Sequence, residues 1–316
     1  MKSRVLLNVM SNIVVIVSVD WEGRSLLDGN LEAMKNFRGR HQDVPMQQFL
    51  NAAYYTKQGA DLSATTKKIQ STLLPEDDHG IHLHAWNSLF EKAGITVVDE
   101  PGFIAVTKAD KFYRNADDWD YYKNDWGYGV RIDQYNVEEL TRVIQTSIDI
   151  LMAEGFHRPY SFRAGGYMAG QNVFEALSKN RFKLDASAGN IRFVKKRFGD
   201  VPFVRWVSEL WSHIDDCSQP YKMSTTHGDI WQLPNNGCLA DYTTAEDILE
   251  VFDKNVRTWQ QLQEQPVFIS IGFHQETAGK FLDRVDSAIT AIKEISLKQN
   301  LPVVFSANPL AYLERT

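Results

Sequence analysis

Short apolar runs alternate along the chain with longer segments in which apolar residues recur every three or four positions. The clearest run, NIVVIVSVD at 12–20, is almost continuously apolar and rich in β-branched residues, which is typical of a strand buried on both faces. Runs of this kind predict strands at 12–20, 80–86, 102–107, 158–164, 182–187, 229–234, 266–273 and 301–307.

Amphipathic helices are predicted between these runs. In the segment 136–155, Asn136 is the expected N-cap and Glu139 follows three residues later, which is the pattern of a capping box. Gly155 stands where a helix commonly ends. The same 3.6-residue spacing of apolar residues predicts helices within 244–263 and 281–297.

Strands that alternate with helices predict a parallel sheet with helices on its outside. About eight such strands make a (β/α) barrel the first candidate and an open doubly wound sheet the second. No glycine-rich phosphate loop follows the first strand, which disfavours a nucleotide-binding fold. We expect one domain over 1–316, with insertions at about 24–78 and 108–128 that act as lids or binding loops, or that pack around their own rings.

Composition narrows the choice of partners and compartment. The net charge of −6 (34 basic and 40 acidic residues) disfavours nucleic acid or an anionic membrane surface as a partner. No apolar run reaches the ~18 residues of a membrane span, and Ser11 and Asn12 interrupt the apolar start, which we interpret as the first strand with a short leader. With only Cys217 and Cys238, a reducing compartment is favoured, so we expect a cytoplasmic protein.

Polar residues gather where the predicted strands end. In a (β/α) barrel the carboxyl ends of all strands meet at one mouth, so residues far apart in sequence would share one site. The residues concerned are Asp20, Glu22, His79, His82, His84, Arg163, Asp185, Ser187, His274 and Glu276.

Asp20 and Glu22 are two residues apart, a spacing that points both carboxylates to one face of a strand. Their repulsion must be relieved by a metal ion, a shared proton or solvent. His82 and His84 have the same spacing, and two neutral imidazoles with a carboxylate are a common set for catalytic zinc. We therefore predict a divalent metal site; His79 could replace one histidine, and the alternative is two strand histidines bonded to backbone or solvent.

The remaining polar residues suggest proton-transfer roles. A carboxylate that does not bind the metal can take a proton from metal-bound water, and Arg163 can keep it ionised or form an ordinary salt bridge. His274 is placed to donate a proton to a leaving group, or is a capped core histidine. Asp185 could orient His274 or Arg163, or bond a loop backbone. Four aromatic residues could stack on sugar rings or only pack: Trp21, Trp86, Tyr167 and Trp231.

Taken in order, the motifs SVDWEG, GIHLHAW, SFRAGG, LDASAG and GFHQE resemble those of the polysaccharide deacetylase family, the NodB-homology group of carbohydrate esterases. They span 17–276 and are similar to the branch found in O-antigen and surface-polysaccharide gene clusters. The resemblance implies a distorted (β/α)7 barrel and hydrolysis of an N-acetyl group on a sugar or polysaccharide precursor. It also implies a divalent metal, most simply zinc, with cobalt, nickel or manganese as alternatives.

The resemblance further implies a role for each motif residue. Asp20 becomes the base, Arg163 holds the base, and His274 becomes the acid. The chain departs from the family because Trp86 stands where the second histidine of the family is found. The implied metal ligands are Glu22, His82 and His84.

Two other functions are compatible with these residues. A glycosidase would use Asp20 and Glu22 as its acid–base pair, although two carboxylates on one strand do not easily flank a glycosidic bond across the usual ~5–9.5 Å. A barrel with a degenerate site would bind a glycan without turning it over. Metal content separates the deacetylase from both alternatives.

Overall fold

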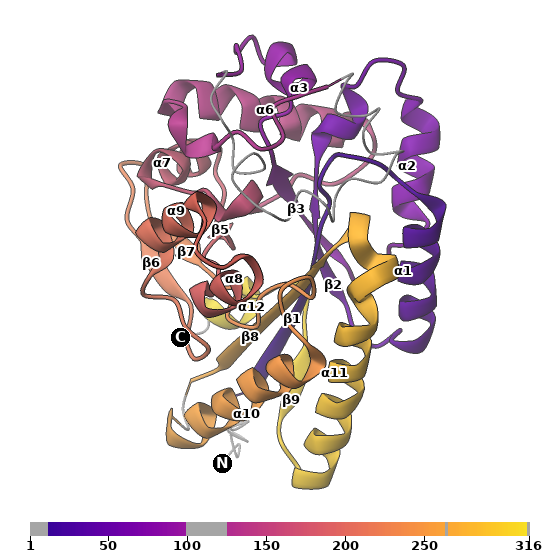
Figure 1. The fold of residues 1–316 in the computed structure, drawn as a ribbon, viewed down its shortest axis with the longest axis vertical. Helices are drawn as coiled ribbons and strands as arrows, with labels where there is room; N and C mark the ends of the chain where they lie inside the picture. Colours follow the sequence, from indigo (N-terminus) through magenta and orange to yellow (C-terminus); the bar gives the residue numbers. More distant parts are fainter. Residues whose placement is uncertain (1–11, 99–124, 263–264, 315–316) are drawn as a thin grey trace, which may run out of the picture.

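The computed structural model describes residues 12–98, 125–262 and 265–314. Within them a sheet curls around a central axis and helices surround it (Figure 1). The strand order is β6-β7-β5-β4-β3-β2-β1-β8, and β9 pairs with β1. All neighbouring pairs are parallel except β6 and β7. The strands are β1 (Ile13–Asp20), β2 (Met46–Leu50), β3 (Asp78–Leu83), β4 (Ser161–Ala164), β5 (Leu184–Asp185), β6 (Tyr221–Met223), β7 (Ile230–Gln232), β8 (Val267–His274) and β9 (Val303–Phe305).

The barrel closes between β7 and β8 through the segment that follows β7. The backbone N–H of Gly237 donates to the carbonyl of Ser270 at 2.9 Å. The N–H of Gly272 donates to Cys238, and that of Ala240 donates to Gly272, both at 2.8 Å. In the described part of the chain, β1–β5, β7 and β8 are thus seven parallel strands, and the segment after β7 connects the two ends of this run. The distorted (β/α)7 barrel implied by the motifs is confirmed.

The helices cover the outside of this sheet, and α1 packs beside α11 (Figure 1). The capping box at Asn136 and Glu139 is present, with both hydrogen bonds at 3.0 Å. No helix within the described ranges is long and apolar enough to cross a membrane. The α-helices are α1 (Asp28–Arg40), α2 (Leu62–Gln70), α3 (Asn87–Lys92), α6 (Val137–Ala153), α7 (Gln171–Lys179), α8 (Ile191–Phe198), α9 (Pro202–Trp211), α10 (Ala245–Leu262), α11 (Ala278–Gln299) and α12 (Leu310–Leu313); the 3-10 turns are η1 (Ala52–Tyr55), η2 (Ile132–Gln134), η3 (Gly165–Tyr167) and η4 (Gln275–Thr277).

One predicted insertion turns out to belong to the barrel. Residues 24–78 contain α1, β2 and α2, and β2 lies between β1 and β3 in the sheet. The expectation of an insertion there is wrong because Gln47 and Gln48 interrupt the apolar run of β2, although both side chains are buried. The predicted strand 102–107 and most of the predicted insertion 108–128 lie outside the described residues.

The interior of the barrel changes from apolar to polar along β1. Side chains alternate between the two faces of a strand, and Val14 and Ile16 belong to an apolar cluster that includes Phe268. Further along the same face come Ser18 and Asp20, both buried. The apolar end therefore holds the barrel together, and the polar end carries the side chains that can do chemistry.

Candidate metal centre and active site

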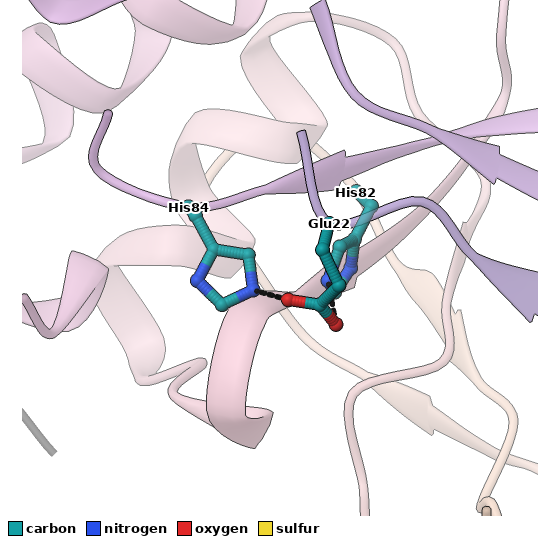
Figure 2. Close-up of side chains that lie close together, drawn as sticks. All are labelled: Glu22, His82 and His84. Atoms are coloured by element: carbon teal, nitrogen blue, oxygen red, sulfur yellow. Dashed lines mark ion pairs between the residues drawn. The ribbon is translucent and has the colours of Figure 1, made fainter. Parts of the chain in front are cut away.

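Three of the predicted metal ligands converge at the carboxyl end of the barrel. Figure 2 shows the side chains of Glu22, His82 and His84 pointing toward one another. His84 Nε2 lies 2.7 Å from Glu22 Oε2, and His82 Nε2 lies 3.4 Å from Glu22 Oε1. Each side chain is only 2% exposed. Their ligand atoms all lie within 4.8 Å of one another, which is close enough to share one ion.

The hydrogen bonds of the two imidazoles show that this set fits a cation. Nδ1 of His82 lies 3.0 Å from the carbonyl oxygen of Arg163, and Nδ1 of His84 lies 2.8 Å from that of Tyr128. A carbonyl oxygen only accepts, so each Nδ1 carries a hydrogen and a neutral ring has its lone pair on Nε2. Lone pairs that face the Glu22 carboxylate repel it unless a cation lies between them. Two such imidazoles and a carboxylate suit a zinc-like ion.

The surroundings shift the pKa values of the ligand set in different directions. Burial lowers the pKa of His82, but Asp20 and Glu22 outweigh it and raise that pKa above its ordinary value. Burial alone would raise the pKa of Glu22, but the imidazoles of His84 and His274 hold it well below its ordinary value. Burial lowers the pKa of His84, against the opposing effect of Glu22. An ionised carboxylate and a neutral imidazole are the forms that bind a metal ion.

Asp20 is held by an arginine inside the barrel. Arg163 Nη1 lies 2.7 Å from Asp20 Oδ1 and also donates to Ser18 Oγ at 2.8 Å. Arg163 Nε donates to the carbonyl of Ala186 at 2.9 Å, so the guanidinium is itself fixed in place. Both side chains of the ion pair are at most 2% exposed. A charge-assisted bond in such a buried setting orients the Asp20 carboxylate.

His274 lies beside Asp20 in the β1–β8 register and is oriented by a residue that the sequence did not reveal. Its Nδ1 is 2.9 Å from Asp241 Oδ2, and its Nε2 is 3.2 Å from Glu22 Oε1. Burial disfavours the charged ring, yet Asp241 and Glu22 raise the pKa of His274 to about 10. Asp241 lies in the loop after β7, within no recognisable motif, and only the barrel closure brings it to His274.

Of the three roles considered for Asp185, the structure shows the bond to a loop backbone. Its carboxylate accepts hydrogen bonds from the N–H of Ser187 at 2.9 Å and from the Ser187 hydroxyl at 2.6 Å. The Ser187 hydroxyl in turn accepts from the N–H of Ala164 at 2.8 Å. Burial raises the pKa of Asp185 to about 6. The residue therefore shapes the ends of β4 and β5.

Three of the four aromatic residues considered for sugar stacking are buried, and the fourth, Trp231, is partly exposed. Trp21 and Trp86 are 0% exposed, and Tyr167 is 3% exposed, so their rings offer no open face. Trp21 follows β1 and belongs to the core cluster that includes Leu31 and Phe37 of α1, and its indole donates to Gln48 at 2.9 Å. Trp231 packs against the apolar cluster that contains Val14 and Ile16.

The structure differs from the sequence-based prediction of the site at two residues, His79 and Tyr128. His79 lies near the amino end of β3, where it stacks on His157, and it is not part of the convergent set. Tyr128 was not predicted, yet its hydroxyl donates to Glu22 Oε2 and its ring stacks on His84 at 4.1 Å between centroids. Tyr128 is the last residue of the predicted insertion 108–128, where no periodic pattern points to a role.

Comparisons with known proteins identify the fold. No family model matches the chain, and no curated protein matches it. Among solved structures, it is similar to a putative polysaccharide deacetylase from Mycobacterium smegmatis, with 9% identity, 94% of this chain and 87% of that chain covered, and a TM-score of 0.53. It is also similar to Puue allantoinase, with 13% identity, 94% of this chain and 87% of that chain covered, and a TM-score of 0.48. A third similar structure is a family 4 carbohydrate esterase from Streptomyces lividans in complex with acetate, with 7% identity, 93% of this chain and 91% of that chain covered, and a TM-score of 0.41. The first of these structures, with its TM-score of 0.53, confirms the fold expected from the motifs.

Proposed function

We propose that this protein is a metal-dependent hydrolase that removes an N-acetyl group from a sugar or a polysaccharide precursor. One observation carries the proposal. A convergent Glu-His-His set lies at the same barrel mouth as an arginine-held aspartate and an aspartate-bound histidine. This combination supplies ligands for an ion, a base and an acid within one buried site.

Glu22, His82 and His84 are the residues that would hold the ion, most simply zinc, while cobalt, nickel or manganese also suit nitrogen and oxygen ligands. When bound, such an ion polarises the acetyl carbonyl and makes a water molecule more acidic.

The protein's own residues then move the protons. Asp20 takes a proton from the attacking water, and Arg163 holds that carboxylate in place through their ion pair. His274 gives a proton to the departing amine, and Asp241 holds its ring through Nδ1. Water adds to the amide carbon and the C–N bond breaks, so the products are acetate and an amino sugar.

A carbohydrate substrate is supported by the neighbour whose TM-score exceeds 0.5, which is described as a putative polysaccharide deacetylase. The motifs, which resemble those of deacetylases from O-antigen gene clusters, extend the proposal to surface-polysaccharide or O-antigen biosynthesis in the cytoplasm. An acetylated precursor is therefore the partner to test first.

The test begins with the metal content of protein purified without chelator, measured by elemental mass spectrometry beside a His82→Ala/His84→Ala variant. We expect about one ion per chain in the wild type and none in the variant. Acetate release from N-acetyl sugars should stop with a chelator and return with zinc. No metal even after soaking with zinc or cobalt would overturn the proposal and favour a glycan-binding barrel. Chelator-resistant cleavage of glycosidic bonds would instead indicate a glycosidase.

A further inference from the structure

We propose that three side chains outside the ligand set preset Glu22 for metal binding, an inference that rests on the proposed metal centre. The three supporting side chains are Trp86, Tyr128 and Glu276. Each engages a different polar group of Glu22: Trp86 the backbone carbonyl, Tyr128 the carboxylate and Glu276 the backbone N–H. Glu22 is therefore held at every polar group that it carries.

The backbone of Glu22 is held from two sides. The Trp86 indole donates to the Glu22 carbonyl at 2.8 Å, and Glu276 accepts from the Glu22 N–H at 3.2 Å. Glu276 also accepts from the N–H of Arg24 at 3.4 Å. Between them, Gly23 has φ of +76°, and a Cβ there would lie 2.8 Å from the Trp86 indole nitrogen. The glycine thus lets the indole come close enough to bond the neighbouring carbonyl.

Tyr128 links two of the proposed ligands. Its hydroxyl donates to Glu22 Oε2, the oxygen that lies 2.7 Å from His84 Nε2. Its carbonyl oxygen lies 2.8 Å from His84 Nδ1, and its ring lies almost parallel to the His84 ring, at 15°. One residue therefore orients the carboxylate and sets the tautomer and plane of the imidazole.

The supporting side chains are themselves held in place. The Tyr54 hydroxyl donates to Glu276, and Lys57 Nζ lies 3.5 Å from the centre of a Trp86 ring. Lys57 also pairs with Asp125 at 2.7 Å. Trp86 and Tyr128 are at most 5% exposed. Moving Glu22 would break buried hydrogen bonds, so its geometry exists before the ion arrives, which favours tight and selective binding.

The chain offers a matched control for this role. Asp77 is a buried carboxylate that accepts backbone N–H groups from Met46 at 2.9 Å and Leu74 at 3.2 Å, much as Glu276 does for Glu22 and Arg24. Asp77 lies just before β3, at the opposite end of the barrel from the ligands. An Asp77→Asn variant therefore disturbs comparable backbone contacts, and in addition the buried ion pair of Asp77 with Arg38, without touching the proposed metal centre.

The experiment compares Tyr128→Phe, Trp86→Phe and Glu276→Gln with Asp77→Asn and the wild type. Zinc affinity is measured by competition with a chromophoric chelator, and the cobalt-loaded proteins are compared by visible absorption. We expect each of the three variants to bind zinc about 10–100-fold more weakly and to show a changed cobalt spectrum. Asp77→Asn should lower the melting temperature and leave both metal readouts unchanged.

The outcomes separate this inference from the proposed function. A wild type that binds neither ion overturns the proposed function and this inference together. A wild type that binds zinc, with three variants that bind it equally well and keep the cobalt spectrum, overturns the supporting role alone. Equal weakening in Asp77→Asn would also overturn it, because general loss of stability would then explain the effect.

Discussion

Two histidines lie at and directly after the carboxyl end of β3, and one lies at its amino end; comparing the two ends shows what makes a metal site. At the carboxyl end, His82 and His84 direct Nε2 toward the carboxylate of Glu22. At the amino end, His79 lies flat against His157, with ring centroids 4.0 Å apart and an angle of 11°. Both ends combine two histidines with an acid, since His157 Nε2 is 3.6 Å from Asp78.

Orientation, and not residue type, distinguishes the two ends. At the carboxyl end, backbone carbonyls take the Nδ1 hydrogens and leave both Nε2 atoms facing one oxygen-rich point. At the amino end, parallel rings cannot direct their nitrogens to a common point, and the Tyr160 hydroxyl donates to Asp78 at 2.5 Å. Burial, together with His157, lowers the pKa of His79 to about 4. His79 therefore packs as a neutral ring against the exposed ring of His157.

The sharpest test of this contrast removes each histidine pair in turn. His82→Ala/His84→Ala should lose bound zinc, with affinity falling by more than about 100-fold, because ligands cost more than their supporting residues. His79→Ala/His157→Ala should keep the wild-type metal content. Elemental mass spectrometry and chelator competition give both numbers. Metal retained by the first variant and lost by the second would reverse the assignment of the two ends.

A second test separates metal binding from proton transfer at the carboxyl end. Asp20→Asn removes the proposed base but leaves the ligand set, so turnover should fall by about 10²–10⁴ while zinc stays bound. Initial rates of acetate release and metal content on the same sample decide the matter. Unchanged turnover would exclude Asp20 as the base.

A smaller effect is expected from crowding one imidazole. A Cβ at Gly165 would lie 2.4 Å from the ring of His84, so Gly165→Ala must displace that ring. We expect zinc affinity to fall about 10-fold, as for a lost supporting contact. Gly39→Ala, where a Cβ meets nothing within 4 Å, is the control and should bind zinc normally. Equal affinities in the two variants would show that the His84 orientation does not matter.

The amino-end pair predicts a dependence of stability on pH. His79 has a folded-state pKa of about 4, below its ordinary 6.5, so between these values the unfolded chain binds the proton and the folded chain does not. Stability should therefore fall as the pH drops from 6.5 toward 4, by on the order of 2 kcal/mol. In His79→Phe, urea titrations across this range should show a shallower decline than in the wild type. An identical decline would assign the acid sensitivity to other groups.

The repetitive parts of the fold were predictable because their signals are local. The capping box of α6 and the apolar run of β1 each follow from neighbouring residues. β2 escaped prediction because its two glutamines look solvent-exposed in the sequence, whereas Gln48 is buried by its bonds to Trp21 and Asp77. A buried polar partner far away in the chain has no local signature.

The site was predictable to the same extent. The ligand set and the Asp20–Arg163 pair come from strand ends, and two-residue spacing indicates which side chains share a face. Asp241 and Tyr128 come from loops whose course depends on the closed barrel. Only the folded loops bring these two residues to the site, so their roles cannot be predicted from spacing along the sequence.

The closure of the barrel between β7 and β8 has a consequence for how the molecule opens. It consists of a few backbone hydrogen bonds around Cys238 and Ala240 and two between the Asn236 side chain and β8, whereas β1 and β8 pair along their whole length. We expect the amide of Ala240 to exchange with deuterium sooner than those at the centre of β1. Asp241 follows directly, so each local opening there would release His274 and leave the metal ligands in place. Local opening of this closure would thus interrupt proton transfer by His274 without releasing the ion.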